Sequence, residues 1–319
     1  MLLPSDFFNS NRPITLYGTT PPRLGASALD LQQAAEKLIE RIEPCEVDGV
    51  VIYDVQDESE RTSQPRPFPF LPTLDSRAYS QMIYQLSGLP IITYKCIGGM
   101  DEAEWKNWLD ESRQHFGIST LSLVGSPAHK PSDSAITLPQ AIQITKAHPA
   151  NFALGGVAIA ERHTPHRNEC QRMVQKGQSG CDFFISQSVY DSQKTITLLN
   201  AYSRRCRAEG ITPKRFIFTF APCGHSKTLD FIKWLGVSVP PHIEKSILES
   251  DDPLSHSITL CRSTLCEILE GLEDPTLALG INVESVSNKK DEIEASLELL
   301  RVLKEVMLEY SASTSGLKG

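Results

Sequence analysis

The sequence lacks the features that mark several classes of protein. It contains no stretch of 18 consecutive apolar residues, so we expect no transmembrane helix. Its first residues lack the basic start and the long apolar run of a signal peptide. Its net charge is −8, with no long run of one sign. A nucleic acid or an anionic membrane surface normally requires a basic face, so we expect neither as a partner.

Cysteine patterning is equally uninformative for metal or disulfide chemistry. The eight cysteines are scattered, and no CxxC pair occurs. Cys223 and His225 are close in sequence, but no further Cys/His spacing supports a zinc site, so we expect no metal. Without a signal peptide, the pattern indicates reduced thiols and therefore a cytoplasmic protein.

What the sequence does contain is an alternation of short apolar runs with longer segments of helical spacing. Several runs are apolar almost throughout, which is typical of parallel strands covered on both faces by helices. The predicted strands are Ile14–Gly18, Gly49–Tyr53, Pro90–Lys95, Ser119–Gly125, Phe152–Ile159, Asp182–Gln187, Arg215–Ala221 and Leu277–Glu284.

Helices are predicted between these strands from apolar residues repeated at helical spacing. They are Ala28–Ile42, Glu102–Phe116, Pro139–Ala147, Arg167–Lys176, Ser192–Ala208, Thr228–Leu235 and Asp291–Leu308. Eight β–α units fit either a closed barrel or a large open sheet. No GxGxxG turn follows the first strand, which weakens the open-sheet alternative. The sequence therefore predicts an α/β protein with a (β/α)8 TIM barrel.

The length fits one domain. An α/β barrel needs about 250 residues, so we expect residues 1–319 to form a single barrel domain. Two connections are unusually long. Residues 54–75 form a proline-rich loop, which we expect to fold over the barrel mouth with Phe68 and Phe70 packed. Residues 238–275 are predicted to be a helical insertion, with an added helix before one that carries Leu265, Leu269 and Leu272.

Reactive groups in such a barrel lie at the carboxyl ends of the strands and in the loops that follow. Polar and ionisable residues occupy these positions: Tyr17, Asp54, Lys95, Glu161, His163, Gln187 and Glu284. For Glu161, His163 and Glu284, a role in holding loops is an equally good interpretation. Asp54 lies in a charged turn, which at the active end of a barrel favours a functional role.

Several segments, in order, resemble the methylenetetrahydrofolate reductases. They run over most of the chain, from about residue 14 to about residue 290. They are Thr19-Thr20-Pro21-Pro22-Arg23, Leu123-Val124-Gly125-Ser126, Gly156-Val157-Ala158-Ile159-Ala160-Glu161-Arg162-His163, Lys176 with Gly180-Cys181-Asp182-Phe183-Phe184-Ile185-Ser186-Gln187, and Trp234 to Pro240. Each motif is weak alone, and their order and spacing carry the resemblance.

The resemblance implies a barrel that binds FAD, takes a hydride from NAD(P)H and passes it to a methylene-tetrahydrofolate. It places Lys176 near the FAD phosphates and Glu169 at the FAD ribose. It also matches Glu161 and His163 to cofactor-binding positions and Gln187 to a folate contact. An ordinary surface pair on a helix is the alternative interpretation of Lys176 and Glu169.

The sequence departs from the family pattern where the family has its acids. The catalytic glutamate position is Gly18, and the aspartate position is Ser126. Losing a general acid costs about 10²–10⁴ in rate. We therefore expect a relocated catalytic carboxylate, with Glu284 as the first choice and Asp54 as the second. Tyr17 and Lys95 are foreign to the family pattern and are predicted to shape the substrate pocket.

Three hypotheses follow from this resemblance. The first is a flavoprotein of folate one-carbon metabolism that reduces methylene-tetrahydrofolate. The second is a folate- or pterin-binding enzyme that transfers a one-carbon unit without flavin chemistry. The third is a folate-binding protein without catalytic activity. The oligomeric state is left open, with a homo-oligomer among the alternatives.

Overall fold

Eight parallel strands close into a barrel in the order β1 to β8 in the computed structural model. The structure describes residues 7–8, 10–58, 62–125 and 135–315. The strands are β1 (Ile14–Thr19), β2 (Gly49–Ile52), β3 (Ile91–Cys96), β4 (Thr120–Val124), β5 (Ala153–Ala158), β6 (Phe183–Ser188), β7 (Arg215–Phe220) and β8 (Leu279–Glu284). The predicted (β/α)8 TIM barrel is confirmed, and every predicted strand lies within about two residues of the observed one.

The strand sequences explain why this sheet is parallel and covered. All six residues of β7, Arg-Phe-Ile-Phe-Thr-Phe, are buried, as expected for a strand packed on both faces. The parallel register continues from strand to strand: Thr93 pairs with Leu121 across β3 and β4, and Thr219 with Asn282 across β7 and β8. The carboxyl ends of paired strands therefore lie next to each other at the same edge of the sheet.

Helices follow the strands. They are α1 (Ala28–Ile42), α2 (Ser76–Ser87), α3 (Glu102–Gln114), α4 (Leu138–Ala147), α5 (Glu169–Ser179), α6 (Ser192–Glu209), α7 (Ser226–Trp234), α8 (Pro241–Leu248), α9 (Pro253–Gly271) and α10 (Lys290–Ser315). Three begin at capping boxes, in which the cap residue and the third helical residue bond each other's backbone. The caps are Ser27, Asp101 and Thr137. Short 3₁₀ turns lie at Glu43–Cys45 and Ala160–Arg162.

The chain divides into two compact units. Unit 1 comprises residues 1–7, 17–157 and 176–183, and unit 2 comprises residues 8–16, 158–175 and 184–319. The boundary passes through β1 and lies near the end of β5 and the start of β6. The expectation of a single domain stays a prediction.

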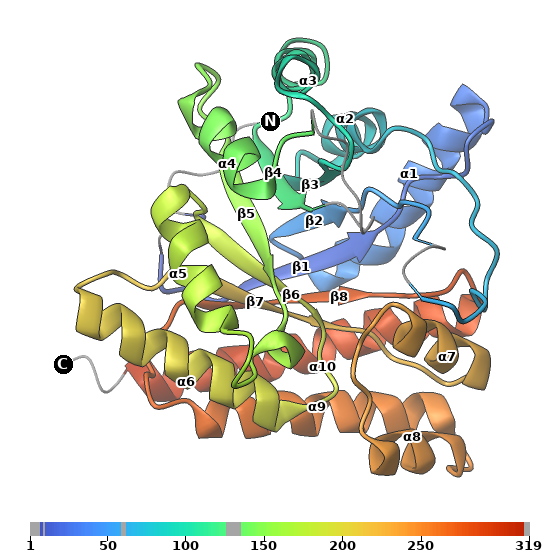
Figure 1. Ribbon diagram of the computed structural model, residues 1–319. Coiled ribbons are helices and arrows are strands. Elements are labelled where there is room, and N and C mark those ends of the chain that lie inside the picture. Colours follow the sequence, from blue (N-terminus) through green and yellow to red (C-terminus); the bar gives the residue numbers. More distant parts are fainter. Residues whose placement is uncertain (1–6, 9, 59–61, 126–134, 316–319) are drawn as a thin grey trace. The chain divides into compact units, whose positions relative to one another are not determined.

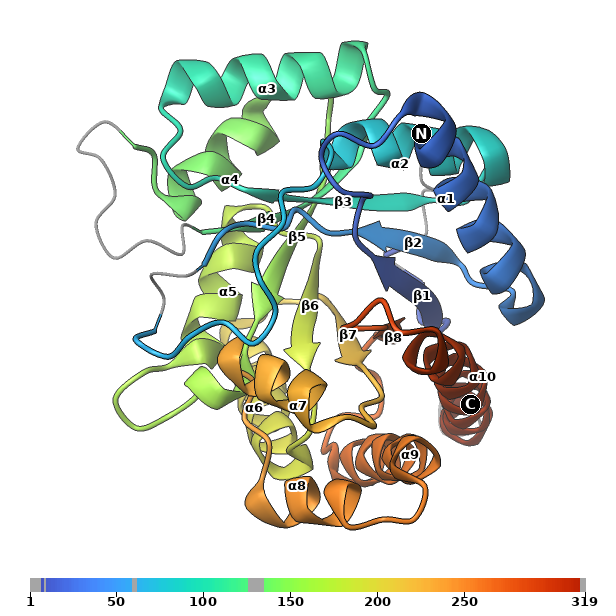
Figure 2. The same cartoon turned by 90° about the vertical axis from the view of Figure 1, so that its right-hand side faces the viewer.

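In unit 1, helices α1 and α2 lie side by side, as do α3 and α4 (Figures 1 and 2). Trp105 is fully buried and stacks on Trp108 with ring centroids 5.1 Å apart. Its indole N–H donates to Ala141 O and to Thr145 Oγ1 of α4. This polar contact and the apolar rings together fix α3 against α4.

In unit 2, α9 packs against α10, α6 and α8 (Figure 1). The amino end of β7 is held by Arg215, which is 1% exposed. Its guanidinium donates to Arg12 O at 3.0 Å, to Leu279 O at 2.5 Å and to Ser10 O. Three carbonyl acceptors take hydrogen bonds from the two Nη groups of this buried cation and tie the segment before β1 to β7 and β8.

The first long connection, residues 54–75, is anchored to the segment that follows β1. In the described part of residues 54–75, the segment around Thr73 forms an antiparallel bridge with Arg23. Leu24 N–H donates to Pro72 O, and Leu74 N–H donates to Pro22 O, so the loop is anchored to the double-proline segment after β1. Phe68 and Phe70 are each half-buried, in agreement with packed rings.

The insertion at 238–275 contains α8 followed by α9, as predicted, although Leu272 caps α9 rather than lying within it. The helix α2 between the long loop and β3 was absent from the predicted helices. Its apolar stripe is short, with only Tyr79 and Ile83 among its buried apolar residues.

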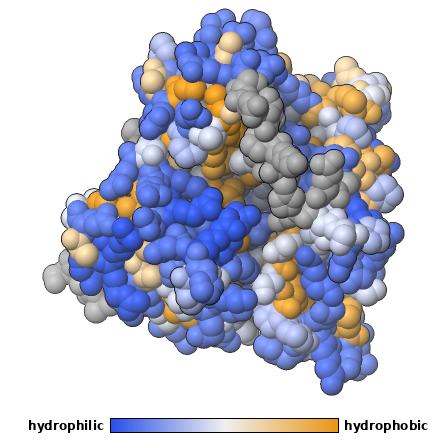
Figure 3. Space-filling model, viewed as in Figure 1, coloured by the Kyte–Doolittle hydropathy of each residue, from blue (hydrophilic) through white to orange (hydrophobic). Residues whose placement is uncertain are grey.

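The surface in Figure 3 is mostly hydrophilic, with scattered hydrophobic areas. Among the described residues, the large exposed apolar side chains are Leu24, Leu29, Leu71, Leu86, Leu248 and Leu308. A helix apolar and long enough to cross a bilayer is not found in the described parts of the chain.

Candidate functional site

The carboxyl ends of β2 and β3 meet at Asp54, which follows β2 in unit 1. Asp54 Oδ2 accepts the Cys96 N–H at 2.9 Å, and Oδ1 accepts from Gln56 Nε2 at 2.8 Å. Lys95 Nζ lies 3.6 Å from Oδ2. Both charged side chains are largely buried, at 17% exposure for Asp54 and 21% for Lys95. Asp54 thus joins the ends of two strands while it partners a buried cation.

Lys95 faces the helices rather than the barrel interior. Thr93 Oγ1 and Ser80 Oγ of α2 lie 2.9 Å apart, so Thr93 faces the helical layer. Side chains alternate along a strand, so Lys95 faces the same way. Its ammonium lies 5.4 Å from the centroid of the Trp108 ring on α3. Tyr94 faces the opposite way and meets Tyr53 edge to face, at 4.9 Å between centroids.

A cavity of about 310 Å³ opens beside Lys95 within unit 1. Its walls come from the segment after β2, from the loop before α2 and from α3. The lining includes Asp54, Gln56, Phe70, Asp75, Lys95 and Trp108. Its size is at the lower end of the range for small-molecule pockets, about 300–1,000 Å³.

Asp75 lines this cavity, and its carboxylate is paired with the Arg77 guanidinium. Arg77 donates to both Asp75 oxygens, with the closest contact, Nη2 to Oδ2, at 2.7 Å. Burial raises the pKa of Asp75, but the hydrogen bonds and charge of Arg77, with the charge of Lys95, outweigh it and hold that pKa below its usual value. Asp75 is therefore ionised at neutral pH and fully engaged.

In unit 2, the carboxyl ends of β6, β7 and β8 carry a row of polar side chains. Asn282 Nδ2 donates to Thr219 Oγ1 at 3.3 Å, and Thr219 N–H donates to Ser186 Oγ at 2.9 Å. One step nearer the carboxyl ends, Ser188 Oγ donates to Glu284 Oε1 at 3.3 Å. The predicted acid Glu284 thus lies at the end of a polar ladder across three strands.

Glu284 faces the barrel interior. Leu279 lines a cavity with Met307 and Tyr310 of α10, so it faces the helices. Alternation then turns Gly280, Asn282 and Glu284 to the interior. A half-exposed carboxylate at the interior end of a barrel strand can bind a ligand or move a proton.

A second group of unit 2 residues gathers around the segment after α7. Gln187 Nε2 donates to Leu235 O at 3.5 Å, and Lys194 Nζ donates to Ser238 Oγ at 3.0 Å. Glu161 lies beside Lys194 and accepts the Ser238 N–H. Burial raises the pKa of the Glu161 carboxyl by more than these N–H donors and the charge of Lys194 lower it. The predicted residues Glu161 and Gln187 therefore contact one and the same loop.

The residues matched to FAD contacts are engaged with the protein backbone. Lys176 Nζ donates to Val157 O at 2.6 Å within unit 1. In unit 2, Glu169 is 1% exposed, accepts the Ile159 N–H through Oε1 at 3.4 Å and faces Arg172 through Oε2 at 3.5 Å. His163 is half-buried after the 3₁₀ turn, and its Nδ1 has no hydrogen-bond partner among the described residues.

The remaining predicted positions are less informative. Tyr17 is 4% exposed in β1. Ser126 lies outside the described residues. Burial raises the pKa of Cys223 to about 12, which leaves it a thiol at neutral pH. His225 Nε2 lies 2.9 Å from Asp291 Oδ2. Among the described residues, no three metal-ligating side chains form a cluster.

The sequence-based prediction missed several residues that shape these sites. Trp108, Asp75 and Arg77 come from α2 and α3 or their caps, whereas the prediction considered the strand ends and the residues that follow them directly. Ser188 is adjacent to the predicted Gln187, and Lys194 lies one helical turn beyond the cap of α6. In the sequence, the feature that could have indicated these residues is that they lie close to a strand end. Ordinary loop residues share this feature, so it does not distinguish them.

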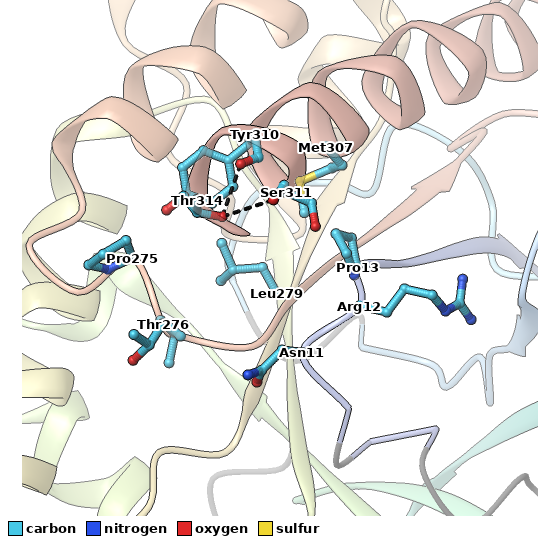
Figure 4. A pocket seen from close by; sticks show the side chains of 11 residues that line it. Asn11, Arg12, Pro13, Pro275, Thr276, Leu279, Met307, Tyr310, Ser311 and Thr314 are labelled. Atoms are coloured by element: carbon cyan, nitrogen blue, oxygen red, sulfur yellow. Dashed lines mark hydrogen bonds between the residues drawn. The ribbon is translucent and has the colours of Figure 1, made fainter. Parts of the chain in front are cut away.

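A cavity at the opposite, amino-terminal ends of the strands has a different character. It has a volume of about 290 Å³ and lies in unit 2. Figure 4 shows Met307, Tyr310 and Thr314 of α10 around Leu279 and Pro13, with the Arg12 side chain directed away. Thr314 Oγ1 donates to Tyr310 O and Ser311 O, so its hydroxyl is used within the helix.

One solved structure is similar to nearly the whole chain. It is an uncharacterised protein from Clostridium thermocellum that binds two copies of 5-methyl-5,6,7,8-tetrahydrofolic acid. It is 32% identical, with a TM-score of 0.78, and the match covers 92% of this chain and 96% of that one.

Two further solved structures are too distantly similar to carry an argument. Oxaloacetate acetylhydrolase is 12% identical with a TM-score of 0.45, and dihydropteroate synthase from Xanthomonas albilineans is 10% identical with a TM-score of 0.46. No protein-family model matches the sequence, and no curated protein matches it. Membership of the methylenetetrahydrofolate reductases therefore stays a prediction.

Proposed function

The chain belongs to the same family as the Clostridium thermocellum protein, and we propose that it too binds a reduced folate of the 5-methyltetrahydrofolate type. The observation that carries the proposal is identity of 32% over nearly the full length of both chains. The resemblance of the sequence motifs to folate enzymes supports the same ligand class independently.

Each unit, taken by itself, has polar groups at its strand ends that suit part of such a ligand. A folate has a pterin ring with hydrogen-bond donors and acceptors, an aromatic linker and a carboxylate tail. Glu284 and Gln187 of unit 2 provide an acceptor and an amide at the ends of β8 and β6. Asp54 and Lys95 of unit 1 provide a carboxylate and an ammonium at the ends of β2 and β3. We assign Glu284 as the substrate anchor or proton donor.

Glu161 is a second candidate for proton transfer. Burial raises its pKa above the usual value for a glutamate, which increases the fraction that is protonated near neutral pH. Such a shift is typical of a general acid. Asp54, in contrast, holds a backbone N–H and a buried lysine, which suits an anchoring role better than proton donation.

The finer proposal, a flavin reductase using FAD and NAD(P)H, has less support. FAD would supply hydride transfer, but the two residues matched to its diphosphate and ribose do not fit it in this arrangement. The Lys176 ammonium already donates a hydrogen bond to a backbone carbonyl, and the carboxylate of Glu169 is inaccessible at 1% exposure. The family glutamate is replaced by Gly18. We therefore propose folate binding without a resident flavin.

Titration calorimetry with 5-methyltetrahydrofolate tests this proposal. We expect saturable binding by the wild-type protein, and roughly 10-fold weaker binding by Glu284→Gln, because a charged acceptor is replaced by a neutral amide. The matched control is Glu294→Gln on α10, whose side chain is 64% exposed and pairs across one helical turn with Lys290. Absence of any binding by the wild-type protein overturns the proposed function. Equal binding by the wild type and Glu284→Gln removes Glu284 from the site.

A further inference from the structure

The cavity beside Asp54 and Lys95 in unit 1 has a feature that the folate proposal does not by itself explain. A carboxylate and an ammonium are held next to each other on one wall, both largely buried, 3.6 Å apart. That distance is longer than the roughly 2.7–2.9 Å of a direct charge-assisted hydrogen bond. The two groups therefore retain hydrogen-bonding capacity for a third partner.

The Gln56 side chain indicates what this wall binds. Its amide N–H donates to Asp54 Oδ1 at 2.8 Å, while Oδ2 is fixed by the Cys96 backbone. An amide N–H of a side chain thus occupies the position that a ligand N–H would take. The carboxylate is fixed from behind and accepts N–H donors from the cavity side.

The charged side chains that line the cavity are all paired. Lys95 partners Asp54, and Asp75 is partnered by Arg77 at 2.7 Å, which also pairs with Glu111 at 3.3 Å. Because each lining charge already has a partner of opposite sign, the cavity does not favour a charged ligand. Phe70 and Trp108 add apolar walls. A neutral, flat ligand with one polar edge complements the shape and charge of this cavity.

We propose that this cavity binds a 2-amino-4-oxopyrimidine ring, the polar edge of a pterin. That edge presents an oxygen acceptor followed by two N–H donors. Asp54 accepts from the ring N3–H and the 2-amino group, and the Lys95 ammonium donates to the 4-oxo oxygen. The inference rests on the proposed folate function, because a folate head carries this ring. Guanine presents the same edge, so the experiment must separate the two sources.

The test compares two probes that differ at one group. Pterin carries the 2-amino donor, and lumazine carries an oxygen acceptor in its place. Wild-type protein should bind pterin roughly 10- to 100-fold more tightly than lumazine, because lumazine directs an acceptor at a carboxylate. Asp54→Asn should lose this preference, since its amide offers one donor and one acceptor. The variant amide keeps an oxygen for the Cys96 N–H, and a thermal melt confirms its fold.

Two control variants define the roles of the pair. Asp110→Asn removes an equal charge from unit 1, at a side chain that is 55% exposed, and should keep the preference for pterin. Lys95→Met should weaken pterin and lumazine equally, because both rings have the 4-oxo group. Its control is Lys106→Met, a side chain that is 53% exposed.

The outcomes separate this inference from the proposed function. Equal affinity of the wild type for pterin and lumazine, or an unchanged preference in Asp54→Asn, overturns the inference. Binding of guanosine without binding of pterin overturns the assignment to folate. If 5-methyltetrahydrofolate binds while pterin shows no dependence on Asp54, the proposed function stands and this inference fails. If 5-methyltetrahydrofolate does not bind the wild type, the proposed function fails first.

Discussion

Replacing Lys176 by methionine distinguishes a structural lysine from a cofactor ligand. The ammonium donates to Val157 O at 2.6 Å and links α5 to the end of β5. A hydrogen bond that involves a charged group contributes about 1.5–3 kcal/mol, and its loss leaves a half-buried carbonyl without this donor. Lys176→Met should therefore lower the free energy of unfolding by about 1.5–3 kcal/mol.

The expected thermal shift follows from the length of the chain. Unfolding entropy is about 2.1 cal/mol/K per residue, or roughly 0.7 kcal/mol/K for a chain of 319 residues, so Tm should fall by about 2–4 °C. The control is Lys290→Met, whose side chain is 83% exposed and pairs with Glu294 at 3.5 Å across one helical turn. It should change the free energy of unfolding by less than about 0.5 kcal/mol.

The assay is urea denaturation at 25 °C with binding of 5-methyltetrahydrofolate and of FAD measured on the same preparations. We expect lower stability with unchanged folate affinity, and no FAD binding by either protein. Unchanged stability together with loss of an FAD affinity present in the wild type would refute the reasoning and restore the role that the reductase resemblance gives to Lys176.

Three further predictions concern stability and reactivity. The Glu161 carboxyl has a raised pKa in the folded protein, so its stabilising contribution is fully present below its unfolded pKa, near 4.5, and is lost as pH rises through the folded pKa. Above that range Glu161→Gln should therefore be more stable than the wild type, as urea titrations at several pH values would show. Gly280→Ala would place a methyl group 2.9 Å from a backbone oxygen of β1 and should cost about 1–3 kcal/mol in the same assay, whereas Gly125→Ala meets nothing within 4 Å and serves as the control. Iodoacetamide at pH 8 should modify half-exposed Cys266 well before Cys223, because burial raises the pKa of Cys223 to about 12, as peptide mass mapping would show.

The barrel was predictable because its strands are buried on both faces. Runs such as Phe216 to Phe220 are apolar apart from Thr219 and lack polar alternation, which is typical of a parallel sheet covered by helices. The amino-terminal caps Ser27 of α1 and Thr137 of α4 are residue types that commonly begin helices. The helix α2 was not predicted, because it follows a long proline-rich loop and has a short apolar stripe.

The direction of individual side chains was harder to predict. Glu284 faces the interior, as a relocated acid requires, because alternation from Leu279 fixes it. Lys95 also lies near the end of a strand, but its side chain faces the helices. Thr93 contacts Ser80 of α2, and side chains alternate along β3, so Lys95 faces the same side as Thr93. If the predicted alternation is shifted by one residue, every side chain of the strand is assigned to the wrong face of the sheet. Strand boundaries predicted from sequence carry errors of at least that size.

The roles of Lys176 and Glu169 illustrate a different limit. A motif match places a residue on the right helix but does not state what its side chain contacts. Here the contacts are backbone groups at the end of β5 and just after it, and only the three-dimensional arrangement reveals them.

Native mass spectrometry of the wild-type protein with 5-methyltetrahydrofolate tests the central claim most directly, because one spectrum reports both the folate and any flavin bound. We expect the chain to gain the mass of bound folate and to carry no FAD. A chain that carries FAD as purified, or that gains no folate mass at saturating concentration, would contradict this expectation.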